Sequence, residues 1–259
     1  MYEFDYLKVS SINEAVSKFK ELDDPRYLAG GHTLLPTMKQ RLASPSHLVD
    51  ISNIPDIIGI STNNNEVSIG SATTHHAVAT SETINNLIPA LAALANEIGD
   101  PQVRIRGTIG GSLANNDPAA DYPAAALALK ATIVTSEREI SCDDFFVDLF
   151  ETALNEGELI TSVKFTVPQK ASYVKFPNPA SRYAIVGVMY AEFEEGARIA
   201  VTGAAPCVFR AHEMEEALKR GEELPEIIAE GLNSDIHAGA EYRAHLVKVM
   251  TKRAIENAK

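Results

Sequence analysis

Two pairs of adjacent glycines constrain this chain more than any other feature of its sequence. Gly30 and Gly31 lie in "AGGHT", between a stretch typical of a strand and one typical of a helix. Gly110 and Gly111 lie in "GTIGGS", ahead of an alanine-rich segment. Glycine removes side-chain bulk and admits positive φ, so several backbone N–H groups can turn toward one anion. One such pair alone favours a tight connection. Two pairs make an anion site as good an interpretation as a chance pairing.

Hydroxyl residues stand beside both pairs, at Thr33, Thr108 and Ser112, and this arrangement suits the two phosphates of a dinucleotide. Neither segment is a GxGxxG fingerprint or a P-loop. The formal net charge of −12, from 35 acidic and 23 basic residues, argues against nucleic acid as the partner. It does not argue against a local phosphate site, because neutral backbone donors can carry the binding.

Two aspartates follow the second glycine pair, at positions 117 and 121. Asp121 precedes "YPAAALALKA", and spacing alone favours it as the N-cap of a helix with Pro123 in the first turn. Asp117 with Pro118 favours a turn. The alternative for Asp121 is a ligand role, in which its carboxylate accepts hydrogen bonds from ribose hydroxyls or from a ring N–H.

The periodicity of the chain predicts a mixture of helices and hairpins with boundaries near residues 55 and 168. Ser11 and Glu14 have capping-box spacing at the start of the first helix. Further helices are predicted over 84–99, 211–221, 224–232 and 240–258, hairpins over 57–74, 131–142 and 183–205, and a strand over 158–168. The division is therefore 1–55, 56–168 and 169–259.

Metal chemistry finds little support in the sequence. The chain has only two cysteines, Cys142 and Cys207, and an iron–sulfur cluster needs about four thiolates. The adjacent His75 and His76 point different ways on either kind of element, which favours a loop or helix start over a metal site. No signal peptide and no membrane-spanning run is indicated, so we expect a cytoplasmic location, with any membrane association arising through partners.

The order of these motifs resembles a known family. "AGGHTLLPTMKQRLASPSHLVDI" and "IRGTIGGSLANNDPAADYPAAALALKA" are similar to the FAD-binding medium subunit of molybdenum-containing hydroxylases, the family of aerobic carbon monoxide dehydrogenase and xanthine dehydrogenase. The resemblance covers nearly the whole chain and continues in "RIAVTGAAP" and "EYRAHLVKVMTKRA". One departure is "KFPNPASRYA", whose prolines at 177 and 179 replace a more basic or polar stretch.

The resemblance implies an α+β fold: a two-subdomain FAD-binding fold of the vanillyl-alcohol-oxidase type, at 1–55 and 56–168, plus a C-terminal α+β domain of antiparallel strands and helices at 169–259. It also implies the cofactor-binding residues, which form two walls around the FAD diphosphate together with an acidic and an aromatic residue. These are Ala29, Gly30, Gly31, His32 and Thr33 in one wall, Thr108, Ile109, Gly110, Gly111 and Ser112 in the other, and Asp121 and Tyr183.

The resemblance further implies an oxidoreductase subunit that passes electrons from iron–sulfur clusters through FAD to an external acceptor, a quinone or NAD. The implied partners are a molybdopterin-binding large subunit and a 2Fe-2S small subunit in a dimerised heterotrimer. Two other functions stay open at this point. One is a stand-alone FAD-dependent oxidase or dehydrogenase, for which the region after Pro168 looks small. The other is a non-catalytic nucleotide-binding module.

Overall fold

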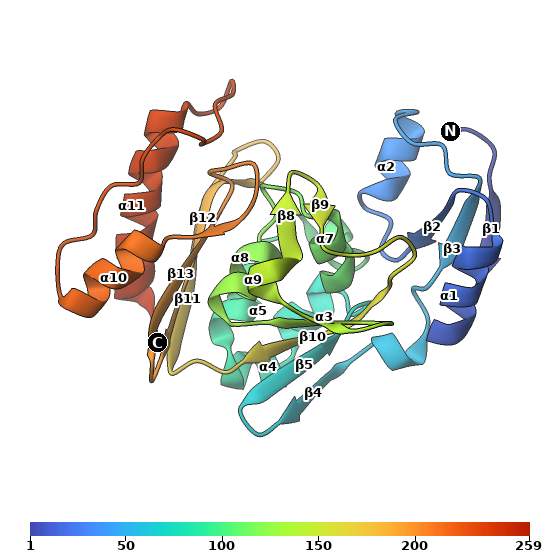
Figure 1. Cartoon of the computed structure of the whole chain (residues 1–259), viewed down its shortest axis with the longest axis horizontal. Helices are drawn as coiled ribbons and strands as arrows, with labels where there is room; N and C mark the ends of the chain where they lie inside the picture. Colours follow the sequence, from blue (N-terminus) through green and yellow to red (C-terminus); the bar gives the residue numbers. More distant parts are fainter.

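A computed structural model describes residues 1–259, the whole chain. Its N-terminal sheet has three parallel strands in the order β1-β3-β2 (Figure 1). The strands are β1 (Asp5–Lys8), β2 (Pro25–Leu28) and β3 (His47–Asp50), and the connections carry α1 (Ile12–Glu21) and α2 (Leu34–Lys39). Ser11 caps α1 by accepting from the Glu14 N–H at 3.2 Å, as its spacing predicted. In a capping box the Glu14 carboxylate would accept a hydrogen bond from the N–H of Ser11. Here it accepts from the N–H of Ser10, at 2.8 Å.

The middle sheet has five antiparallel strands in the order β4-β5-β10-β6-β7. These are β4 (Ile60–Asn63), β5 (Glu66–Gly70), β6 (Thr132–Thr135), β7 (Glu139–Ser141) and β10 (Ile160–Thr166). A 3-10 turn (Pro55–Ile57) leads into it, and a small hairpin of β8 (Phe146–Asp148) and β9 (Glu151–Thr152) stands apart. The chain segment that forms the middle sheet also contains seven helices, which are α3 (His75–Thr80), α4 (Glu82–Leu87), α5 (Pro89–Asn96), α6 (Pro101–Arg104), α7 (Ile109–Asn115), α8 (Tyr122–Ala128) and α9 (Cys142–Phe145).

The C-terminal sheet has four antiparallel strands in the order β11-β12-β13-β14. Its elements are β11 (Lys170–Pro177), β12 (Ala184–Phe193), β13 (Gly196–Thr202), β14 (Phe209–Arg210), α10 (His212–Arg220) and α11 (Ala240–Asn257). The two helices cover one face of this sheet, at the end of the molecule away from the N-terminal sheet (Figure 1). The chain is thus an α+β protein. Its three main sheets lie within 5–50, 60–166 and 170–210, and the division into three domains stays a prediction.

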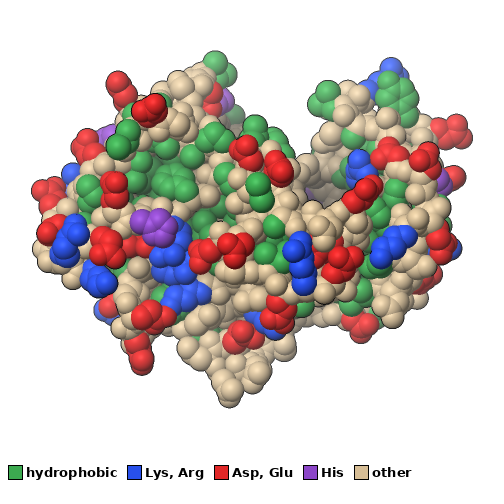
Figure 2. Space-filling view, in the orientation of Figure 1, with side chains coloured by type: hydrophobic (Ala, Val, Ile, Leu, Met, Phe, Trp, Pro, Cys, Tyr) green, Lys and Arg blue, Asp and Glu red, His purple; other side chains and the backbone are tan.

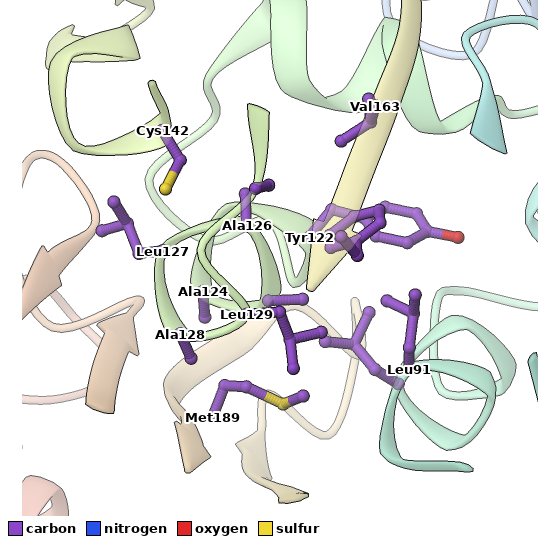
Figure 3. Packing of buried hydrophobic residues seen from close by; sticks show 14 of the residues in the cluster. Leu91, Tyr122, Ala124, Ala126, Leu127, Ala128, Leu129, Cys142, Val163 and Met189 are labelled. Carbon is purple, nitrogen blue, oxygen red and sulfur yellow. The ribbon is translucent and has the colours of Figure 1, made fainter. Parts of the chain in front are cut away.

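Helix α8 lies at the centre of the largest core, where every one of its residues is buried. Its alanines let the middle and C-terminal sheets approach it closely, since small side chains hold the packed layers near one another. In Figure 3, side chains of α8 face Met189 of β12, with Leu91 of α5 beside them. This packing fixes the start of α8, and so the position of Asp121, relative to the C-terminal sheet.

Two predicted helices are wrong in part or whole. The helix predicted over 84–99 is two helices, because Ile88 precedes Pro89 and adopts φ −140° and ψ 65°. The helix predicted over 224–232 is irregular backbone. Leu224 and Ile227 pack on the C-terminal core while Ile228 is 71% exposed, and a helix this short is marginal in water. No helix of the structure has the length and apolar character that crossing a membrane requires.

Candidate cofactor site

A cavity of about 820 Å³ opens between the N-terminal sheet with its two helices and the rest of the molecule. Figure 2 shows the surface hollowed there, beside α2. The volume falls within the range of small-molecule and cofactor sites. Most of the lining comes from four segments, which are residues 26–37, 98–121, 154–160 and 180–183. Of the twelve predicted cofactor-binding residues, all except Ile109 line this cavity.

The first glycine turn presents a row of unused backbone donors. Five consecutive N–H groups, from Gly30 through Leu34, donate to no protein acceptor. Gly31 has φ +72°, a conformation that favours glycine, and it turns the chain into α2. Unpaired N–H groups next to a cavity attract an anion, and the N-terminus of α2 adds its dipole. His32 and Thr33 are exposed here, and the Thr33 side chain caps nothing, which leaves its hydroxyl available.

The second glycine turn differs, because most of its N–H groups are already bonded within the protein. Those of Ile109 and Gly110 donate to the carbonyls of Thr73 and Ser71, at 3.1 and 2.9 Å. That of Gly111 donates to the Thr108 hydroxyl oxygen at 3.2 Å, where Thr108 caps α7. The N–H of Thr108 has no acceptor in the protein, so this turn offers one free backbone donor where the first turn offers five.

What the second turn offers the cavity is hydroxyl groups and open space. Thr108 still has its own O–H to donate, and Ser112 makes no side-chain hydrogen bond within the protein while lining the cavity. A Cβ on Gly111 would meet only the Thr108 hydroxyl oxygen, at 2.9 Å. Ile109 is fully buried behind this wall, because α7 turns its side chain into the core.

The two glycine turns touch each other at the base of the cavity. A Cβ on Gly30 would lie 2.2 Å from the carbonyl oxygen of Arg106 and 2.7 Å from the Cα of Gly107. Glycine at position 30 is thus required by a close backbone approach. The contact sets the spacing of the two walls.

Asp121 begins α8 but does not cap it, since its side chain accepts no bond from the helix N–H groups. The carboxylate instead accepts a hydrogen bond from the Tyr173 hydroxyl and lies 3.1 Å from the Lys175 ammonium. Both partners are on β11, about fifty residues away in sequence. Burial raises the pKa of Asp121, and the Lys175 charge acts against that rise. Asp121 reaches the cavity wall with its carboxylate held by these two residues.

Tyr183 lies at the exposed end of the cavity, 50% exposed, directly before β12. The loop before it is ordered by Asn178, whose side-chain oxygen accepts from the N–H groups of Ala180 and Ser181. Arg182 adopts φ +65° and donates to the carbonyl of Gly99 at 3.2 Å, across the cavity. Pro177 ends β11 at a register shift, so the prolines that depart from the family pattern close a strand and begin this turn.

Sequence reasoning missed several lining residues. Leu34, Ser71, His75, Gly99 and Arg182 all contribute to the wall. A pattern could have identified only Leu34, since it extends the run of N–H groups after the first glycine pair. The others come from segments that tertiary packing brings to the site. No group of three or more histidine, cysteine, aspartate or glutamate side chains is arranged to hold a metal ion.

Comparison with known proteins gives a consistent result. Residues 2–169 match the family model described as the FAD binding domain in molybdopterin dehydrogenase. The glyceraldehyde dehydrogenase medium chain of Sulfolobus acidocaldarius is 35% identical over 275 residues, covering 98% of this chain and 98% of that protein. The carbon monoxide dehydrogenase medium chain of Afipia carboxidovorans is 35% identical over 278 residues, covering 99% and 96%.

Solved structures agree with the sequence comparisons. A crystal structure of the Cu,Mo-CO dehydrogenase in its cyanide-inactivated form superposes with a TM-score of 0.87 at 33% identity, over 98% of this chain and 97% of that one. Quinoline 2-oxidoreductase from Pseudomonas putida superposes with a TM-score of 0.88 at 28% identity, over 98% and 95%.

Proposed function

This chain belongs to the family of FAD-binding medium subunits of molybdenum hydroxylases, and from that premise we propose that it is the electron-transfer subunit between iron–sulfur clusters and an external acceptor. The acceptor would be a quinone or NAD. Bound FAD supplies the electron-carrying chemistry, while the protein supplies position and electrostatics. The observation that carries this proposal is the row of five unpaired N–H groups from Gly30 to Leu34 on the wall of a cofactor-sized cavity.

The residues present fit the diphosphate of FAD. The first glycine turn would bind it with backbone N–H groups, so the overall acidity of the chain does not oppose the contact. Thr108 and Ser112 would donate hydroxyl hydrogen bonds from the opposite wall. Gly111 would leave the space that the diphosphate needs, since a Cβ there would point into the gap above Thr108.

The flavin ring would lie toward Asp121 and Tyr183. Tyr183 has an exposed aromatic face at the cavity rim, which suits stacking on a planar ring. Asp121 would accept a hydrogen bond from a polar group of FAD while Tyr173 and Lys175 hold its carboxylate still. The buried Lys175 ammonium balances the Asp121 charge, so this part of the wall presents an oriented acceptor rather than an isolated anion.

The partners would be a molybdopterin-binding large subunit and a 2Fe-2S small subunit, in a dimerised heterotrimer. The matched relatives are named as medium chains, which implies companion chains in those proteins. In this chain Cys142 is buried and Cys207 is partly buried, and no group of side chains is arranged for a metal. Sites for molybdenum and iron–sulfur clusters would therefore come from the companions.

Purification of the tagged chain from its native cells tests the whole proposal. We expect a yellow complex that holds FAD, molybdenum and iron, with two companion chains in equal amounts. A chain that purifies alone and oxidises a substrate with a soluble acceptor at enzyme-like rates would favour the stand-alone oxidase or dehydrogenase. A colourless chain that takes up no FAD during dialysis would favour the non-catalytic module.

A further inference from the structure

His75 is a buried polar residue that the proposed contacts leave unused. It is 5% exposed, stands in the first turn of α3 after the cap Thr74, and lines the cavity. Neither ring nitrogen has a hydrogen-bond partner in the protein, and Nδ1 is completely enclosed. Burial lowers the pKa of His75 to about 4, and the nearby His32 and Arg104 act in the same direction. The ring is therefore neutral near pH 7, with one N–H donor and one acceptor nitrogen.

The Nε2 edge of this ring faces the backbone at Gly107. A Cβ on Gly107 would lie 2.5 Å from Nε2, so the imidazole occupies the room that any larger residue at 107 would need. Gly107 also lies against Gly30 of the first glycine turn, since a Cβ on Gly30 would lie 2.7 Å from the Cα of Gly107. A continuous chain of contacts therefore runs from His75 through Gly107 to Gly30, where the row of free N–H groups begins. The absence of a side chain at 107 leaves Nε2 next to the point where the two walls meet.

Packing holds the imidazole in this orientation. The ring of Tyr122 lies against it, with centroids 5.3 Å apart and planes tilted by 43°. Tyr122 is itself fully buried and does not line the cavity. Nδ1 is completely enclosed, so Nε2, which also has no partner in the protein, is the ring nitrogen that a ligand can reach. A polar group that a bound ligand encloses without pairing costs about 1–3 kcal/mol, which favours a ligand atom that pairs with Nε2. A rigidly held, neutral and unpaired imidazole on a cavity wall is suited to bind a ligand atom.

We propose that His75 is a further cofactor contact, which donates its Nε2–H to an oxygen of FAD in or next to the diphosphate. This inference rests on the proposed binding of FAD in the cavity. The oxygen would belong either to the diphosphate itself or to a sugar hydroxyl on one side of it, since a diphosphate bound at the first glycine turn would bring these oxygen atoms near His75. The contact uses a neutral donor, which adds specificity without adding charge.

The chain supplies a matched control in the neighbouring residue. His76 is exposed, lies on the same helix and does not line the cavity. We expect His75→Gln and His75→Leu to weaken FAD binding about tenfold, the loss of one hydrogen bond with its partner left unpaired. His76→Gln should bind FAD as the wild type does. Equilibrium dialysis of FAD against the apoprotein measures all three, and circular dichroism checks that each variant is folded.

Competition against FAD by fragments locates the oxygen. If the His75 variants lose affinity for ADP but not for FMN, the bonded oxygen is on the adenosine side. If they lose affinity for FMN but not for ADP, it is on the flavin side, and a loss for both places it at the phosphates. Unchanged affinity for FAD, ADP and FMN in both His75 variants would overturn the inference. So would an equal loss in His76→Gln, because the effect would then belong to the helix as a whole.

A second measurement uses the wild type and needs no variant to fold. In protein labelled with ¹⁵N in histidine, adding FAD should shift the ring-nitrogen signals of His75 and leave those of His76 in place. His75 signals that do not move when FAD is bound would contradict the contact. A wild-type protein that binds no FAD at all would instead defeat the proposed function, so the two failures are distinguishable.

Discussion

Gly30 and Gly107 are in backbone contact, although 77 residues separate them: a Cβ on Gly30 would lie 2.7 Å from the Cα of Gly107. The same atom would lie 2.2 Å from the carbonyl oxygen of Arg106. This contact joins the N-terminal sheet to the middle of the chain at the base of the cavity. It explains why the first turn needs glycine at a position where φ is not positive.

The first prediction concerns this contact. Gly30→Ala forces the two turns apart, and overpacking of this kind costs about 1–3 kcal/mol in free energy of unfolding. Urea denaturation measures the change. Gly239→Ala is the steric control, because the nearest atom to its added Cβ is 4.0 Å away. Gly239 is the N-cap of α11, so the only expected cost is the weaker capping by alanine, at most about 1 kcal/mol. Equal effects in the two variants would show that the contact is not tight.

The second prediction separates binding from folding at the neighbouring glycines 110 and 111. Gly111→Val places its side chain above Thr108, toward the cavity, and should abolish FAD retention while the fold persists. Gly110→Val drives its side chain into the backbone of Ser71, where a Cβ would lie 2.8 Å from the carbonyl oxygen, and should lower stability severely. Flavin absorbance after gel filtration and the thermal midpoint measure the two effects. Retention of FAD by Gly111→Val would contradict the placement of the diphosphate.

The third prediction concerns the buried pair of Lys175 and Asp121. Lys175→Met leaves the Asp121 carboxylate buried without its cation, which costs about 3–5 kcal/mol. Burial already raises the pKa of Asp121, and removal of the cation should raise it further. The folded state then holds a proton that the unfolded state releases, so stability falls as pH rises through the folded-state pKa. Relative to the wild type, the loss should be larger at pH 8 than at pH 5.

The control for this pair is on the surface. Lys164 pairs with Glu139 in partly exposed positions, and exposed ion pairs contribute about 0–1 kcal/mol. Lys164→Met should therefore change stability little, with no marked dependence on pH between 5 and 8. A similar pH profile for both variants would assign the effect to net charge instead of to the buried pair.

The fourth prediction is a pH dependence of the apoprotein from His75. Its pKa is lowered from 6.5 to about 4, so between these values the unfolded state binds a proton that the folded state refuses. The stabilising contribution is present above pH 6.5 and is lost as pH falls toward 4, to an extent of about 3 kcal/mol. The difference in unfolding free energy between wild type and His75→Gln, measured from pH 7 to pH 4.5, isolates this residue from the carboxylates. A difference that is constant with pH would contradict it.

Local patterns predicted much of the fold. The hairpin at Asn63–Asn65 and the cap at Ser11 depend on residues close in sequence, and the structure confirms both. The break at Ile88 was also within reach, because the residue before a proline disfavours helix. The strand β11 went unrecognised, since it has no turn of its own and is defined by pairing with β12.

The features that local patterns did not predict depend on contacts between residues far apart in the sequence. Asp121 has the position and the following proline of a cap, yet its carboxylate turns to Tyr173 and Lys175, which no local pattern connects to it. The second glycine turn has the composition of an anion site, yet the N–H groups of Ile109 and Gly110 bond to the carbonyls of residues 73 and 71. In both cases a residue far along the chain forms the hydrogen bond that the local pattern had assigned to a helix cap or to a bound anion.

The free N–H groups from Gly30 to Leu34 also have a practical consequence for anyone handling the apoprotein. Inorganic phosphate and sulfate carry the same kind of oxygen as the diphosphate and can occupy the same donors. With the diphosphate bound at these donors as proposed, reconstitution in millimolar phosphate buffer would be an exchange in which FAD displaces an inorganic ion. The affinity for FAD measured in such a buffer would be lower than the affinity measured without a competing anion, so the buffer anion has to be stated with each dissociation constant.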